Sequence, residues 1–137
     1  MIKRPGTLAV ELPFRVQTYE IDFAGHVSNL VYLRWTEDLR LEVLERYFPL
    51  SLCMESGYTP ILISSSITYK RAVKLFDEPH GIMCVSRSGN ARLTFEAEIR
   101  VGGQVMAQSL QLGAFVDLKT HRPLRIPEHV ARAFDGV

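Results

Sequence analysis

The sequence has little of several features that would narrow its function at once. Only two of its 137 residues are cysteines, Cys53 and Cys84, and neither has metal-like Cys or His neighbours. We therefore expect two buried thiols without special chemistry. The formal net charge is only +1, so the chain lacks the basic field that gathers nucleic acid, and we expect no nucleic-acid partner.

Long apolar runs are also missing. No stretch approaches the length needed to cross a membrane, and the N-terminal segment 1–6 lacks the apolar core of a secretory leader. We therefore expect a cytoplasmic protein with no membrane partner. The sequence has no Gly-rich phosphate loop, no Gly-x-Ser-x-Gly elbow and no His-Glu-x-x-His motif. Its length fits one domain, residues 1–137.

Alternating apolar and polar residues predict five strands. Pro13 falls on the outer face of the first strand, which suggests an edge position or a bulge. Short turns join the later strands, and Gly102-Gly103 is a two-residue hairpin signal. The predicted strands cover residues 10–16, 59–72, 82–87, 92–101 and 104–118.

One long helix is predicted from Ser28 or Asn29, both good N-cap residues, to about Phe48, where Pro49 stops it. Its apolar sector is wide, so the helix should be largely surrounded by a curled sheet. The order of elements favours an α+β fold in which a five-stranded antiparallel sheet wraps round this helix. The two apolar stripes contain Tyr32, Trp35, Leu39, Val43 and Tyr47, and Leu33, Leu41, Leu44 and Phe48.

Two carboxylates in and near this helix are candidate functional groups. Asp22 ends a predicted strand just before a Gly-containing turn and the helix start, and an acid beside the positive helix end can hold and attack a carbonyl. Glu37 projects on the apolar side between Leu33 and Leu41. A carboxylate there is either paired in a structural contact or faces a substrate cavity.

The pattern Asp22-x-x-Gly25-His26-Val27-x-Asn29-x-x-Tyr32-Leu33-x-x-x-Glu37-x-x-Arg40 resembles a known signature. It is similar to that of the hotdog-fold acyl-CoA thioesterases of the 4-hydroxybenzoyl-CoA thioesterase class. The His-Val-x-Asn segment most resembles the long-chain acyl-CoA thioesterase III-like branch. The segments 67–73 and 90–100 support the resemblance, which extends over nearly the whole chain.

The resemblance implies that Asp22 is the catalytic carboxylate, either a general base on water or a nucleophile on the thioester carbonyl. Backbone N–H groups from about Val27 to Leu30, at the helix start, would polarise the carbonyl. Gly25 would let the backbone pass close to the thioester, or simply form the turn. Asn29 would cap the helix or contact substrate, and His26 would mostly brace the turn.

The substrate positions are less defined. Ser28 and Asn29 depart from the ring-contacting residues of the hydroxybenzoyl enzymes, which favours a fatty or other acyl group. Tyr32 and its apolar neighbours suit an acyl chain or an ordinary core. Basic residues could meet the phosphates of coenzyme A or simply be solvated. They form two groups, Lys70, Arg71 and Lys74, and Arg87 and Arg92.

These features predict an acyl-CoA thioesterase without a cofactor. The alternatives are an acyl-carrier-protein thioesterase and a non-catalytic module that binds acyl groups or lipid. The resemblance also implies a homodimer or homotetramer with active sites at the subunit interface. The predicted substrate contacts are His26, Val27, Tyr32, Glu37, Lys70, Arg71 and Arg92.

Overall fold

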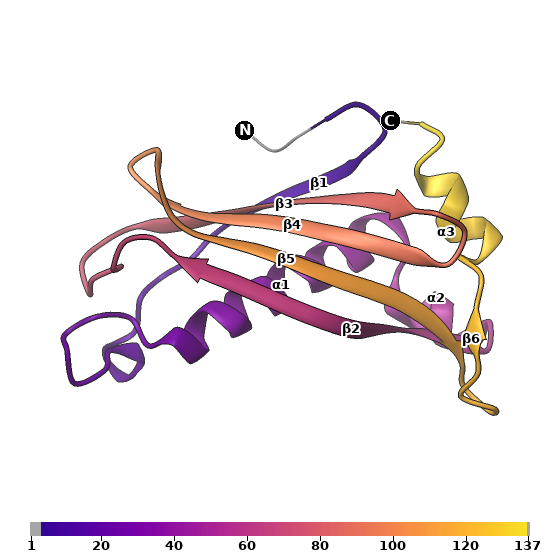
Figure 1. Cartoon of the computed structure of the whole chain (residues 1–137), viewed down its shortest axis with the longest axis horizontal. Coiled ribbons are helices and arrows are strands. Elements are labelled where there is room, and N and C mark those ends of the chain that lie inside the picture. The colour runs from indigo at the N-terminus through magenta and orange to yellow at the C-terminus, as the bar shows by residue number, and fades with distance from the viewer. Residues whose placement is uncertain (1–3, 137) are drawn as a thin grey trace.

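Helix α1 (Asn29–Tyr47) lies along one face of a curved antiparallel sheet in the computed structural model (Figure 1). The structure describes residues 4–136, so the first residues of the segment assessed for a leader lie outside it. The remaining helices are the 3-10 helix η1 (Thr18–Glu20), α2 (Leu50–Glu55) and α3 (Glu128–Ala133). The strands are β1 (Leu8–Pro13), β2 (Tyr58–Tyr69), β3 (Pro79–Ser88), β4 (Arg92–Val101), β5 (Gln104–Asp117) and β6 (Pro123–Leu124).

The strands follow the order β1-β3-β4-β5-β2, and β6 pairs with the end of β5. All five predicted strands are present, and β6 is an addition of only two residues. Pro13 is the last residue of β1, an edge strand, as its missing N–H requires. Gly102 and Gly103, with φ of 57° and 80°, form the predicted hairpin turn between β4 and β5.

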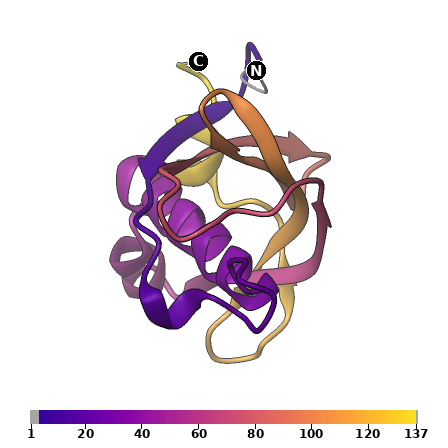
Figure 2. The same cartoon turned by 90° about the vertical axis from the view of Figure 1, so that its left-hand side faces the viewer.

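The core lies between α1 and the concave face of the sheet, which curls round the helix when viewed end-on (Figure 2). Leu39 and Val43 of α1 are completely buried, and Trp35 stacks on Phe14 with ring centroids 5.1 Å apart. Thus the first predicted apolar stripe of the helix faces the sheet, since burial of such a stripe drives helix packing. Both cysteines are buried and free, as predicted.

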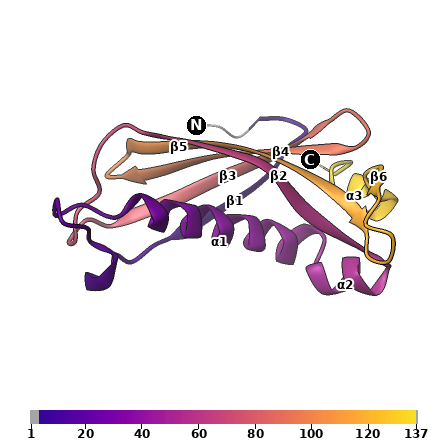
Figure 3. The ribbon, with the colours of Figure 1, turned by 60° about the horizontal axis from the view of Figure 1, so that its bottom comes forward.

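The second apolar stripe is only partly covered, contrary to the prediction that the helix is largely surrounded. Leu33 and Leu41 remain 43% and 47% exposed, and Figure 3 shows α1 below the sheet with no described element beneath it. The outer edge of β2 has no neighbouring strand among residues 4–136. No helix in this described range is long and apolar enough to cross a membrane.

Candidate active site at the start of the long helix

Asp22 lies in a tight turn that leads into α1. It does not end a strand as predicted, because the 3-10 helix η1 and the single bridge residue Ile21 precede it. An isolated bridge joins Ile21 to Val27, and the Asp22 N–H donates to the His26 carbonyl at 2.8 Å. One carboxylate oxygen, Oδ1, accepts hydrogen bonds from the N–H groups of Ala24 at 2.9 Å and His26 at 3.2 Å. The turn therefore fixes the carboxylate through Oδ1, whereas Oδ2 has no hydrogen-bond partner in the described part of the chain.

Gly25 is needed for the conformation of this turn. Its φ is 78°, in the left-handed region that favours glycine, and its N–H donates to the Asp22 carbonyl at 3.0 Å. A side chain built on Gly25 would meet no atom within 4 Å. The backbone angle therefore explains the glycine, and a steric contact with another residue does not.

The helix start offers fewer amide groups than predicted. The Val27 N–H donates to the Val73 carbonyl and the Ser28 N–H to the Glu20 carbonyl, each at 2.8 Å. The prediction that these two amides polarise a carbonyl is therefore wrong. The amides of Asn29 and Leu30 have no recorded backbone acceptor in residues 4–136, as expected for the first turn of a helix.

Ser28, not Asn29, is the N-cap residue of α1, so the cap role predicted as one option for Asn29 is wrong. Asn29 is exposed and its carbonyl accepts a hydrogen bond of 3.3 Å from the Tyr69 hydroxyl. His26 is exposed at the turn, which it braces through its backbone, whereas the Val27 side chain is buried in the core. Val27 therefore presents no side chain to a substrate.

Two tyrosines pack together near this turn, and the buried one, Tyr32, does not present its side chain to a substrate as predicted. Tyr32 is buried and packs edge to face against Tyr69, with ring centroids 5.1 Å apart. Burial raises the pKa of Tyr32, and the neighbouring negative charge of Asp22 acts in the same direction. Tyr32 therefore stays protonated at neutral pH. Tyr69 was not predicted as a site residue, and its only sequence signal is its place at the end of an amphipathic strand.

The structure separates the predicted basic residues. Lys70 and Arg71 are exposed directly after Tyr69, and their backbone N–H groups both donate to the Met106 carbonyl. Arg92 starts β4 and pairs with Ala114, whereas Tyr69 pairs with Ala107. Seven residues along β5 correspond to about 23 Å, so within one chain Arg92 lies at the opposite end of the sheet from Lys70.

Arg40, rather than Glu37, points inward from α1. The Glu37 side chain is 61% exposed, and its Oε2 lies 4.0 Å from Arg40 Nη2. The Arg40 side chain is only 18% exposed, and its Nη1 donates to Gln111 Oε1 at 2.6 Å. The Gln111 amide in turn donates to Ser65 Oγ at 2.9 Å and Thr36 Oγ1 at 3.4 Å. These residues form a polar cluster beside the core, in which Thr36 and Gln111 are buried.

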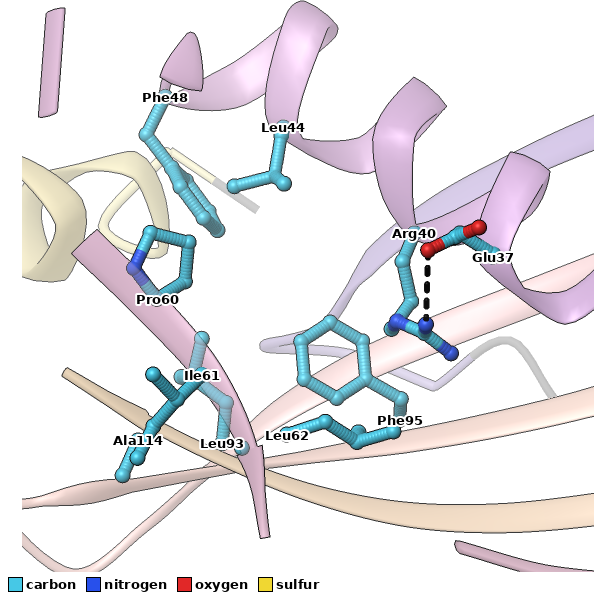
Figure 4. A pocket seen from close by; sticks show the side chains of 11 residues that line it. Glu37, Arg40, Leu44, Phe48, Pro60, Ile61, Leu62, Leu93, Phe95 and Ala114 are labelled. Carbon is cyan, nitrogen blue, oxygen red and sulfur yellow. Dashed lines mark ion pairs between the residues drawn. The ribbon is translucent and has the colours of Figure 1, made fainter. Parts of the chain in front are cut away.

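A cavity of about 230 Å³ lies next to this cluster (Figure 4). Figure 4 shows the Arg40 guanidinium and Glu37 at one end and Leu44, Phe48 and Pro60 at the other. Most of the lining is apolar, so the cavity suits a hydrocarbon or aromatic group. The lining residues are Glu37, Arg40, Leu44, Phe48, Pro60, Ile61, Leu62, Leu93, Phe95, Gly113 and Ala114.

Comparison with known proteins identifies the family. The model of the thioesterase-like superfamily matches residues 16–134. No match was found among curated protein sequences. Three solved structures with similar folds are described next, each spanning nearly the whole chain.

A 1,4-dihydroxy-2-naphthoyl-CoA thioesterase from Synechocystis is 16% identical with a TM-score of 0.83, covering 93% of this chain and 96% of that one. A predicted thioesterase from Bacillus stearothermophilus is 22% identical, with a TM-score of 0.83 and coverages of 94% and 96%. A thioesterase from Thermus thermophilus, complexed with coenzyme A and Zn, is 23% identical, with a TM-score of 0.78 and coverages of 92% and 91%.

The chain belongs to the thioesterase-like superfamily. The structural similarity confirms the predicted hotdog fold, an antiparallel sheet wrapped on one long helix. The family confirms the predicted class of enzyme, a thioester hydrolase.

Proposed function

We propose that this protein is an acyl-CoA thioesterase and that Asp22 is its catalytic carboxylate. One observation carries the proposal: the turn that fixes Asp22 Oδ1 leads directly into the start of α1. Within residues 4–136, neither Asp22 Oδ2 nor the amides of Asn29 and Leu30 have a recorded hydrogen-bond partner. A carboxylate and helix-terminal donors are the two groups that thioester hydrolysis requires.

Asp22 acts in one of two ways in this proposal. As a general base it takes a proton from water, which then attacks the thioester carbonyl. As a nucleophile it attacks that carbonyl itself, expels the CoA thiolate and forms a mixed anhydride, which water then hydrolyses. In both routes the amides of Asn29 and Leu30 stabilise the negative charge that develops on the carbonyl oxygen. The Tyr69 hydroxyl, which donates to the Asn29 carbonyl, lies beside the same helix start.

The decisive variant is Asp22→Asn, because asparagine keeps an oxygen that can accept the two turn hydrogen bonds. We expect thiol release from a panel of short, medium, long and aromatic acyl-CoAs to fall by about a hundredfold to ten-thousandfold, with acyl-CoA still bound. Asp117→Asn is the matched control, since Asp117 Oδ1 also holds a turn through two backbone amides at the far end of β5.

Two other outcomes would favour the alternative functions. No thiol release by the wild type, with acyl-CoA bound equally by wild type and Asp22→Asn, would favour a non-catalytic acyl-binding module. Release only from acyl-carrier protein would favour a carrier-protein thioesterase, whose acidic carrier would meet the basic residues near Tyr69.

Coenzyme A is the proposed carrier because a structurally similar thioesterase is described as complexed with coenzyme A. The exposed basic residues Lys70, Arg71 and Lys74 follow Tyr69, at the same end of the sheet as Asn29, where they can meet phosphates. Arg92 lies about 23 Å away within the chain and would reach the same coenzyme A molecule only from a second subunit.

We expect Lys70→Ala with Arg71→Ala to raise KM for acyl-CoA about tenfold and to leave kcat nearly unchanged, because phosphate contacts are equal in the ground and transition states. The effect should shrink as salt is added, since exposed charges are screened. Steady-state kinetics at low and high ionic strength measure it. A fall in kcat with an unchanged KM would contradict a phosphate-binding role.

We also propose that residues 1–137 act as one hotdog domain in a homodimer or homotetramer. The support is the long β2 edge without a neighbouring strand in the described chain, with Ile61, Leu62 and Ile63 all exposed. Pairing of this edge with a second copy would cover these apolar residues.

A further inference from the structure

The boundary between α1 and β2 leads from the candidate active site to the cavity. At its first end the Tyr69 hydroxyl donates to the Asn29 carbonyl. In its middle, Gln111 connects Ser65 of β2 to Thr36 and Arg40 of α1. At its other end, Pro60 and Leu62 of β2 face Leu44 and Phe48 across the cavity. The two elements therefore run antiparallel, and one helix face lines the whole path.

The helix periodicity supports the same path. Asn29, Leu33, Glu37, Arg40 and Leu44 fall within one narrow sector of α1 at 3.6 residues per turn. Leu33, which is 43% exposed, places an apolar residue on this sector between Asn29 and the cavity. An acyl group with its carbonyl at Asn29 would follow this line toward Arg40.

Arg40 is an unusual residue to find in such a cavity. Burial lowers its pKa, which shows that the environment disfavours its charge, and Glu37 only partly opposes this effect. Glu37 is mostly exposed and 4.0 Å away, without a recorded hydrogen bond to the guanidinium. Of the five guanidinium N–H groups, only one has a recorded hydrogen-bond acceptor in residues 4–136. The guanidinium is thus largely buried, and its described neighbours are one neutral amide oxygen and one carboxylate at 4.0 Å.

We propose that the acyl chain runs along the boundary between α1 and β2 into the cavity, and that Arg40 selects acyl groups ending in a carboxylate. This inference rests on the proposed thioesterase function and names its substrate class. A carboxylate would complete the partners of the guanidinium with strong charge-assisted hydrogen bonds, while the methylene chain lies against the apolar lining. A terminal methyl would leave the guanidinium desolvated and unpaired.

The length of this path sets the size of the acyl group. Arg40 is eleven residues beyond Asn29, or about 16 Å along the helix axis. An extended chain advances about 1.2 Å per bond, so the roughly eleven bonds of a twelve-carbon acyl group cover about 13 Å and leave about 3 Å for the contact between its carboxylate and Arg40. The cavity is also larger than the roughly 150 Å³ cavity that accepts benzene, so it can hold the end of such a chain with its carboxylate.

The test compares three CoA thioesters of equal length: the monothioester of dodecanedioic acid, dodecanoyl-CoA and ω-hydroxydodecanoyl-CoA. For the wild type we expect kcat/KM to be on the order of 10- to 100-fold higher for the dicarboxylic substrate than for dodecanoyl-CoA. In Arg40→Met, which keeps an apolar chain in the cavity, this ratio should fall to one or below. Taking the ratio within each variant removes any general loss of folded enzyme.

Three further variants sharpen the test. Arg40→Lys should restore part of the preference, because it restores the charge without the planar fork. Glu37→Gln, an exposed change that should not affect folding, should raise the ratio several-fold because it removes a competing negative charge. Arg46→Met is the control, since Arg46 pairs with Glu42 on the exposed helix surface, and it should leave the ratio unchanged.

A wild type that prefers dodecanoyl-CoA or the hydroxy substrate would overturn the inference. So would an Arg40→Met enzyme that loses activity equally on all three substrates, which would show a purely structural arginine. Hexanoyl-CoA is too short to reach Arg40 and reports on the proposed function alone. If wild type hydrolyses it and Asp22→Asn does not, while the dicarboxylic preference is absent, only the proposal for the acyl path fails.

Discussion

At the residue scale, the two carboxylate oxygens of Asp22 have different roles. Oδ1 holds the turn through Ala24 and His26, while Oδ2 is left for chemistry in our proposal. Gly25 allows this arrangement, because its positive φ turns the chain so that Val27 returns to form a bridge with Ile21. The geometry of the carboxylate thus depends on a residue with no side chain.

A comparison of two glycines tests this dependence. Gly25 and Gly89 have φ of 78° and 68°, and an added side chain would meet nothing at either position. We expect Gly25→Ala and Gly89→Ala each to lower the free energy of unfolding by about 1 kcal/mol through backbone strain. Only Gly25→Ala should also reduce thiol release. If the two variants were equally active at equal concentrations of folded enzyme, the turn geometry would not matter for catalysis.

At the element scale, α1 packs closely on the sheet at Gly81, where β3 has no side chain. A side chain built on Gly81 would lie 2.8 Å from Leu39 Cδ1 and 2.7 Å from Phe14 Cε2. Leu39 is completely buried at the same point. The glycine therefore makes room for the leucine, and the two positions should be energetically coupled.

A double-mutant cycle measures this coupling. Leu39→Ala should lower the free energy of unfolding by about 2 to 5 kcal/mol by leaving a cavity. Gly81→Ala should cost about 1 to 3 kcal/mol, because side-chain ends of Leu39 and Phe14 must shift. The double variant should be more stable than the sum of these costs by about 1 kcal/mol, since the new methyl group fills part of the cavity. Strict additivity in urea denaturation would contradict the close approach.

The sequence predicted most of these elements because their signals are local. The bounds of α1, the five main strands and the Gly102-Gly103 turn follow from periodicity and turn residues. The site was predicted less completely because it depends on pairing between distant segments. Nothing near Val27 in the sequence indicates that Val73 takes its amide. Likewise, helical spacing could not show that Arg40 would reach Gln111, seventy-one residues away, while Glu37 stayed exposed.

At the scale of the whole molecule, two apolar surfaces remain open. One is the β2 edge with Ile61, Leu62 and Ile63, and the other is the α1 face with Leu33 and Leu41. An exposed, long edge strand with apolar residues is a surface that soluble proteins cover or protect with charge. This is the physical basis of the proposed homo-oligomer.

We expect light scattering to give at least a dimer for the wild type, and Ile63→Lys to shift it toward a monomer by placing a charge at the bulge of β2. Leu52→Lys, a similar change at an exposed leucine of α2, is the control and should leave the mass unchanged. If the wild type were a monomer at micromolar concentration, the prediction that the active sites lie at a subunit interface would lose its support.

The hydrogen bond between the Val27 amide and the Val73 carbonyl has a consequence for local opening. It ties the Asp22 turn to the segment between β2 and β3, which begins with Lys70 and Arg71. Segments joined in this way tend to open and close together, so the amides of Val27 and Ser28 should show the same free energy of opening in hydrogen exchange as those of Lys70 and Arg71. A ligand that holds the basic segment still would then slow exchange in the turn of Asp22 as well, without touching it.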